Sequence, residues 1–451
     1  MCVRLKRDVE DKTPCRRSYD SSCSRDLIMA KAGLKLRFVL PSTTGNSSCL
    51  QICTLKRKLG CIMFPSHILR MKAYFFFIYF GLGGLFPLLT VYLQDIGLSG
   101  AQIGVITSIG PVTMILVQPL WGMLSDLTKR PRLLLMAAST GAAFSGLAYA
   151  GVTDYYVFVA VAVMLAVFQS AVIPLSDNLA MNYVKRKGGD YGRIRMWGAV
   201  GFAVAVWIMG NLSDLFGLQV IFYGFFLVFA VSALTAAGLP NENAAVRVDL
   251  RGGLGKLMRV PGFLLFLLIT FLVYGPIMAN NFYFGVMIQF AGGSLAGVGF
   301  AFLLAAGSEV PFMRWAGDWI HRRGVLWILT AAALVSGLRW LFYSFEPSPG
   351  WIYATTILQG FSIGLFVPAA LQYVSDLAPP EVKATAVSVY AAVGNGVGAF
   401  FFSLSAGLIL DFHSILGVYF FYGVMTLTGA LLMLVLARRT KNAVSLSLPG
   451  G

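Results

Sequence analysis

Charged residues are scarce in this chain. Asp, Glu, Lys and Arg make up only 12% of its 451 residues, against about a quarter of a soluble domain, while 57% are hydrophobic. Such a composition excludes an ordinary soluble globule. The apolar residues stand in continuous runs of about 20, enough for a helix to cross a bilayer, and do not alternate as in a β-barrel. We therefore predict an all-α membrane protein.

Cysteine is absent after residue 61. All six cysteines lie up to that point, so the first 62 residues differ in kind from the rest. Cys49 and Cys53 lack the paired knuckles and the histidines of a zinc site, and no signal-peptide pattern is present. Three interpretations stay open: a disordered cytoplasmic tail, an extension upstream of a real start at Met63 or Met71, and a regulatory metal or redox arm.

Motifs of nucleotide-driven and enzymatic chemistry are also absent. The sequence contains no GxxxxGK[ST] phosphate loop, so no ATP-driven pump is predicted. No Cys/His cluster and no nucleophile–base pairing occurs among the apolar runs, so we expect neither an enzyme nor a metal or cofactor site. The net charge of +16 arises partly from fourteen Lys and Arg before residue 71. The other basic residues stand in short loops, so nucleic acid is not an expected partner.

Hydropathy predicts twelve membrane-spanning helices in two sets of six. Their approximate limits are 72–94, 101–124, 132–151, 154–180, 192–212, 217–239, 261–290, 295–319, 324–345, 350–376, 382–410 and 414–437. The stretch between the sets begins Pro-Asn-Glu-Asn and is Gly-rich and basic, as a linker should be. The expected division is an extension over 1–70, six-helix bundles over 71–239 and 261–437, a linker over 240–260 and a tail over 438–451.

Lys and Arg occupy alternate loops of this arrangement. The basic loops are 128–132, 185–195, 247–259, 321–323, Lys383 and 438–441. Those near 95–102, 151–155, 211–218, 290–297, 345–350 and 411–414 contain neither residue. By the positive-inside rule, both termini are expected in the cytoplasm and the number of spans is even. The expected location is the plasma membrane.

One short turn occurs twice. In residues 119–130 and again in 311–322, a Pro is followed seven residues later by an Asp and eleven residues later by an Arg. Residues 198–205, Gly-Ala-Val-Gly-Phe-Ala-Val-Ala, similarly resemble residues 391–398, Ala-Ala-Val-Gly-Asn-Gly-Val-Gly. Duplication at this spacing indicates two similar membrane half-domains, and so a transporter.

Six plus six spans with a repeated turn resemble the major facilitator superfamily. Gly122, Asp126 and Arg130 look like that superfamily's signature between spans two and three, and Asp318 and Arg322 look like its second copy. All five lie at the membrane edge. We expect them to form a cytoplasmic gate, because an Asp at a helix end pairs with basic groups or helix N-termini across that face.

Span five carries a narrower resemblance. Residues 191–202, Tyr-Gly-Arg-Ile-Arg-Met-Trp-Gly-Ala-Val-Gly-Phe, resemble the lactose permease and phenylpropionate permease branch. That resemblance implies that Asp177 partners Arg195, as in the sugar site of the lactose permease, and that Arg339 is a cavity Arg. It has limits, because Gln359 replaces the proton-coupling His of span ten. The proton pathway of that permease therefore cannot simply be carried over.

Charges within the spans are the main functional clue, since each costs at least about 2.5–3.5 kcal/mol on insertion scales. Asp177 and Arg195 are interpreted either as a solute-contacting pair or as a structural pair that pins two helices. Arg339 would join them in binding solute. The polar amides Gln359 and Asn281 are candidate solute contacts, with helix–helix hydrogen bonding as the alternative.

Glu309, inside span eight, is the candidate proton carrier. A buried carboxyl group is suited to that role. The alternative is a salt bridge to Arg314 or Arg339. Arg314 itself is expected to pair with Asp318, four residues further along the helix.

These residues predict a secondary active transporter that works by alternating access. The leading hypothesis is proton-coupled symport of a small organic solute, either an aromatic acid or a sugar-like molecule. Its partners would be that solute, protons and the lipid bilayer, and we expect a monomer. Two alternatives remain: a proton-driven exporter on the same fold, and a transporter-like sensor or scaffold in which the N-terminal arm carries the signal.

Overall fold

The computed structural model describes residues 67–241 and 250–447. The expectations for residues 1–66, including the six cysteines, lie outside the described residues. The long helices are α2 His67–Asp95, α3 Gly100–Thr128, α4 Pro131–Ala148, α5 Tyr155–Lys187, α6 Tyr191–Phe216, α7 Val220–Ala236, α9 Phe263–Phe290, α10 Leu295–Arg323, α11 Val325–Tyr343, α12 Pro349–Leu377, α14 Ala399–Phe412 and α15 Ile415–Ser447. Shorter elements are η1 Tyr149–Gly151, α8 Leu250–Leu257, η2 Pro380–Val382, α13 Lys383–Ala391 and the π-helix η3 Ala392–Gly398.

The predicted all-α membrane fold is confirmed. Within the described residues, eleven helical segments are long and apolar enough to cross a membrane, and α7 is a twelfth apolar helix of 17 residues. The eleventh predicted span corresponds to η2, α13, η3 and α14 together, over Pro380–Phe412. The first helix begins at His67, five residues before its predicted start. α8 is a short helix within the stretch predicted as a linker.

Several helices begin at polar N-caps, as their sequences favour. The side chain of Ser99 accepts a hydrogen bond from the Gln102 backbone N–H at the start of α3. Asp190 does the same for Gly192 at the start of α6. Prolines inside the helices, such as those of α3 and α10, do not end them, because neighbouring helices support the freed backbone groups.

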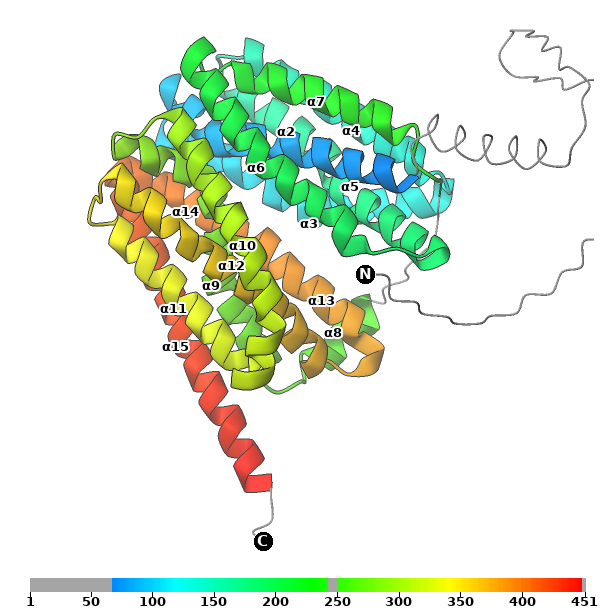
Figure 1. The fold of residues 1–451 in the computed structure, drawn as a ribbon, viewed down its shortest axis with the longest axis vertical. Helices are drawn as coiled ribbons and strands as arrows, with labels where there is room; N and C mark the ends of the chain where they lie inside the picture. Colours follow the sequence, from blue (N-terminus) through cyan, green and yellow to red (C-terminus); the bar gives the residue numbers. More distant parts are fainter. Residues whose placement is uncertain (1–66, 242–249, 448–451) are drawn as a thin grey trace, which may run out of the picture. The chain divides into compact units, whose positions relative to one another are not determined.

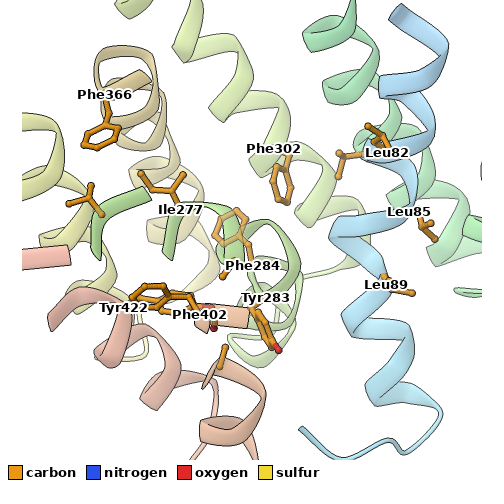
Figure 2. Packing of buried hydrophobic residues seen from close by; sticks show 14 of the residues in the cluster. Leu82, Leu85, Leu89, Ile277, Tyr283, Phe284, Phe302, Phe366, Phe402 and Tyr422 are labelled. Carbon is orange, nitrogen blue, oxygen red and sulfur yellow. Dashed lines mark hydrogen bonds between the residues drawn. The ribbon is translucent and has the colours of Figure 1, made fainter. Parts of the chain in front are cut away.

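Aromatic and aliphatic side chains fill the interior of each bundle. Helices α2–α7 and α9–α15 form two bundles, coloured blue to green and green to red (Figure 1). Figure 2 shows Phe284 of α9 near Phe302 of α10, and their rings meet edge to face at 5.5 Å. In the same bundle, Phe402 and Tyr422 pack edge to face at 6.1 Å. Such pairs add about 0.5–1.5 kcal/mol to the burial of their area.

Close contact between α2 and α6 depends on glycine. A Cβ atom on Gly83 would lie 2.5 Å from the Phe202 carbonyl oxygen of α6. We expect Gly83→Ala to destabilise the protein by about 1–3 kcal/mol, because two backbones would have to move apart. Gly110→Ala is the matched control, since no atom lies within 4 Å of its Cβ position. Thermal unfolding in detergent checks this, and equal melting temperatures of the two variants would contradict it.

The two bundles meet at one end of the molecule. α3 packs on α14 and α6 on α10, near the ends where α3 and α10 begin and α6 and α14 finish. We call this the closed end, and the opposite end, where α6 begins, the linker end. Toward the linker end the same helices expose large side chains, among them Leu120, Leu127, Met313 and Trp315. The bundles therefore touch at the closed end and part toward the linker end.

Candidate solute and coupling site

The contact between Phe202 of α6 and Phe302 of α10 marks where the two bundles still touch. Their ring centroids are 5.9 Å apart. Arg195 lies seven residues from Phe202, and Glu309 lies seven residues from Phe302, both toward the linker end. Seven residues are two helical turns, about 10 Å, so each charged residue lies on the same helix face as its Phe. Helix geometry thus puts Arg195 and Glu309 at one depth, on facing sides of the two bundles.

Asp177 of α5 and Arg195 form the predicted pair. Arg195 Nε lies 3.5 Å from Asp177 Oδ1, and the side chains of Arg195 and Asp177 are 35% and 27% exposed. This distance exceeds the 2.7–2.9 Å typical of a strong charge-assisted hydrogen bond. Asp177 Oδ1 is itself buried and has no hydrogen-bond donor in the structure. The pair is therefore not saturated with hydrogen bonds, and both side chains stay partly exposed.

Aromatic rings of α2 support the guanidinium group. The Arg195 Cζ atom lies 4.3 Å from the centroid of the Tyr79 ring and 5.7 Å from that of Phe75. Gly198 makes room for this stack, because a Cβ there would lie 2.7 Å from the Tyr79 ring. Cation–π contact of this kind holds the Arg in place, and the Tyr191 side chain lies within hydrogen-bonding range of both Arg195 and Asp177.

A second polar group is buried in the other bundle. Arg339 of α11 is only 4% exposed, and its Nη1 donates a hydrogen bond of 2.9 Å to Gln359 Oε1 of α12. Its Cζ lies 5.4 Å from the Tyr343 ring, and its Nε has no acceptor. The hydroxyl of Ser362, one turn beyond Gln359, also lacks a partner. We call Arg339, Gln359 and Tyr343 the Arg339 cluster. It carries a cation without a carboxylate partner among the described residues.

Glu309 lies where α10 crosses α12. A Cβ on Gly360 would lie 2.7 Å from the Glu309 backbone nitrogen, and one on Gly364 would lie 3.0 Å from its carbonyl oxygen. Gln359 of the Arg339 cluster is the neighbour of Gly360, and Tyr274 of α9 is within electrostatic range of the Glu309 carboxylate. Glu309 is partly buried, and its carboxylate makes no ion pair with a described residue. The alternative salt bridges to Arg314 and Arg339 are thus not formed.

The amides of α9 differ in their surroundings. Asn281 is half-buried and makes no side-chain hydrogen bond with another described residue, so it remains available to a solute. Its neighbour Asn280 is buried and accepts a 2.7 Å hydrogen bond from the Tyr419 hydroxyl of α15, which joins two helices. Asn395 is half-buried on the π-helix η3, next to the point where Gly394 packs on Tyr274. π-helical turns are frequent at functional sites because they re-aim side chains.

The residues of the two repeated turns lie apart from this site. Asp126, Arg130, Asp318 and Arg322 are exposed at the linker end, and none forms an ion pair with another described residue. Gly122 has open space around its Cβ position. The bundles are separated at this end, so the expected gate contacts are not made in this conformation.

One local pairing was predicted wrongly. Arg314 and Asp318 form no ion pair, although they stand four residues apart on α10. Both side chains are exposed, and an exposed pair of this spacing contributes only about 0.3–0.5 kcal/mol, too little to fix two mobile side chains.

Sequence reasoning also missed the aromatic support of Arg195 and the half-buried Tyr274. The signal for the first was Gly198, one turn beyond Arg195, which opens space for a ring. No pattern in the chain pairs α2 with α6, so the identity of that ring, Tyr79, could not be read from sequence. Tyr274 comes close to Glu309 because α9, α10 and α12 pack together, and no sequence pattern indicates that proximity.

Within the described residues, eleven helical segments of membrane-spanning length and the shorter apolar α7 form two bundles, with charged side chains where the bundles part. This is the arrangement of a secondary transporter of small solutes. The family described as "MFS_1 like family" matches residues 68–421. The chain therefore belongs to this family of the major facilitator superfamily, as the doubled turn predicted.

Two relatives and one solved structure are similar to this chain over most of its length. The chain is 47% identical to the maltose permease of Geobacillus stearothermophilus over 82% of this chain and 94% of that protein. It is 25% identical to a probable 3-phenylpropionic acid transporter of Escherichia coli over 76% and 91%. Its fold is similar to that of the nucleoside transporter NupG, with a TM-score of 0.73, 16% identity, and coverage of 82% and 98%.

Proposed function

We propose that this protein takes up a neutral sugar of the maltose class together with a proton. The observation that carries the proposal is the partly exposed contact between Asp177 and Arg195, which at 3.5 Å is longer than a strong charge-assisted hydrogen bond and leaves the Asp177 Oδ1 without a donor. A sugar hydroxyl both donates and accepts, so one hydroxyl group is able to donate to the carboxylate and its neighbour to accept from the guanidinium. The similarity to a maltose permease supports a sugar over an aromatic acid.

The charges of the site support a neutral solute. Asp177 and Glu309 balance Arg195 and Arg339, so a neutral sugar adds no net charge to a region where charge is costly. Arg339, Gln359 and Asn281 would supply further hydrogen bonds on the side of the second bundle. The Arg339 Nε has no acceptor and Asn281 is partly exposed, whereas the Gln359 amide oxygen already accepts from Arg339 and would be shared with the solute.

Glu309 is proposed as the proton carrier. It is the carboxylate on the second bundle at the depth of Arg195, and it has no cationic partner that would hold it ionised. A carboxyl group that lies between the bundles is exposed to each side in turn as they rock, which is what coupling to a proton gradient requires.

The proposal also covers the oligomeric state, the location and the orientation of the protein in the membrane. The protein would work as a monomer in the plasma membrane, with both termini and the linker end in the cytoplasm, because the basic loops are at that end. The structure would then have its solute site open to the cytoplasm. The two turn motifs would close that side in the opposite conformation, with Asp126 and Asp318 each pairing with basic groups or helix N-termini of the opposite bundle.

Uptake of radiolabelled maltose into proteoliposomes tests the proposal. With an inwardly directed proton gradient, we expect accumulation above the external concentration, and an uncoupler should collapse it. The control is the same vesicles with an equal pH on both sides, where only equilibration is expected. Solute that leaves the vesicles against its gradient would indicate an exporter instead. Uptake of phenylpropionate in place of maltose would overturn the sugar assignment.

A further inference from the structure

Two aspartates at the closed end each cross from one bundle to cap a helix of the other. The Asp214 carboxylate, near the end of α6, accepts hydrogen bonds of 3.2 and 2.9 Å from the first two backbone N–H groups of α10. The Asp411 carboxylate, near the end of α14, likewise accepts from the first two N–H groups of α3, the second at 2.8 Å. Each bundle therefore supplies one carboxylate and receives one.

These contacts complete caps that the helices only half possess. Ser99 and Ser294 precede α3 and α10, and each accepts from the third N–H group of its own helix. The first two N–H groups have no partner within a helix. In the structure they are bound by the carboxylate of the opposite bundle, which also complements the positive end of the helix dipole.

The arrangement is duplicated in the sequence. Ser294 follows Ser99 by 195 positions, and Asp411 follows Asp214 by 197 positions. Gly210 and Gly407, each four residues before its Asp, are separated by the same 197 positions. A fold built from two similar halves thus places two equivalent carboxylates on two equivalent helix N-termini.

Glycine brings the backbones close enough for these contacts. A Cβ on Gly210 would lie 2.5 Å from the Leu295 carbonyl oxygen. On the other side, a Cβ on Gly100 would lie 2.5 Å from the Gly407 carbonyl oxygen. Both contacts join one bundle to the other, so they would break if the bundles parted at this end.

We propose that Asp214 and Asp411 are paired latches that hold this end of the transporter shut and set how often it opens. The proposal rests on the alternating-access function proposed above. When the bundles separate at the closed end, both carboxylates are withdrawn, and the N–H groups they cover must bind water. Both carboxylates are exposed to solvent even in the closed form. The latches therefore favour the form in which this end is shut, without preventing the form in which it is open.

The distance across the closed end reports the latches directly. With the six native cysteines replaced by Ser in the full chain, spin labels are placed at Ile96 and Phe345, which are exposed at this end on different bundles. We expect Asp214→Ala and Asp411→Ala each to raise the ratio of long to short distances by about fivefold, as loss of one helix N-terminal cap would. The double variant should raise it by about twenty-five-fold, since separate sites act independently.

Asp154→Ala is the matched control. Asp154 caps α5 at the same end, but within its own bundle, by accepting from Tyr156 and Val157 at 2.9 and 3.1 Å. It should leave the distances unchanged. Asp214→Asn, which keeps an acceptor oxygen, should have a smaller effect than Asp214→Ala, and it serves as the test if the Ala variant fails to fold.

Distances that stay unchanged in both Ala variants, or that change equally in Asp154→Ala, would overturn the latches. The measurement needs no solute and no proton gradient. A shifted distribution in a protein that does not carry maltose would therefore reject the proposed solute and leave the latches standing. Normal maltose uptake with unshifted distances would reject the latches and leave the proposed solute standing.

Discussion

Replacing Arg195 with Gln is expected to lower maltose uptake by about 10- to 100-fold, the effect of one or two lost hydrogen bonds to a charged group. Asp177→Asn should act similarly, because it removes the acceptor of the solute hydroxyls. Both losses follow from one geometry: an ion pair at 3.5 Å that is still one-quarter to one-third exposed. Initial rates of labelled maltose uptake at matched expression measure the effect.

A neighbouring pair provides the control. Arg193 and Asp190 also stand 3.5 Å apart at the start of α6, but their side chains are 81% and 58% exposed. Arg193→Gln should leave uptake within about twofold of the unsubstituted protein, because exposed pairs contribute little. A loss as large as that of Arg195→Gln would point to a general defect of α6.

The double variant Asp177→Asn with Arg195→Gln separates binding from structure. If the pair only pins α5 to α6, neutralising both members removes the uncompensated charge, and uptake should recover along with thermal stability. If the pair binds solute, stability should recover while uptake stays low. Recovery of uptake would show that the pair is structural.

Replacing Glu309 with Gln is expected to abolish gradient-driven accumulation while it spares exchange of internal for external maltose. Gln keeps the size and hydrogen-bonding ability of the side chain but cannot take up and release a proton. The loaded carrier can then still reorient, whereas coupling to the proton gradient is lost. Accumulation and counterflow in the same proteoliposomes measure the two activities separately.

Glu346→Gln serves as its control. Glu346 is an exposed carboxylate in the loop after α11, away from the space between the bundles, and both activities should be unchanged. Accumulation that persists in Glu309→Gln would show that another group carries the proton. Loss of both activities together would place Glu309 among the solute contacts.

Much of this architecture could be predicted from sequence because the bilayer leaves so few choices. Apolar runs of about 20 residues must become helices, and their ends agreed with the structure to within a few residues for most spans. The larger differences occurred where water competes with the membrane: at His67, at the end of α5, at α8, and in the tail of α15. The Asp177–Arg195 contact was also predictable, since each charge is too costly to stand alone in a span.

Other parts of the site depend on packing between distant helices. The absence of an ionic partner for Glu309 is an example. The sequence places Arg314 on the same helix and Arg339 on the next one, so either was a candidate partner. Arg339 instead bonds Gln359, because α11 and α12 bring these two side chains together inside the second bundle. Neither charge nor spacing in the sequence shows whether Arg339 pairs with Glu309 or with Gln359, since either side chain would give its guanidinium group a hydrogen-bond acceptor.

The sequence by itself determined the membrane class, the two halves, the doubled turn and the presence of charges within the spans, because burial in lipid penalises every other arrangement of the apolar residues. Only the tertiary structure decided which end of the molecule is shut. The repeated turns occupy the parted end, while Asp214 and Asp411 lie at the other end and bond the first N–H groups of α10 and α3 in the opposite half. Which of two equivalent ends closes depends on a small free-energy difference between two packings of the same helices, and local sequence patterns do not encode that difference.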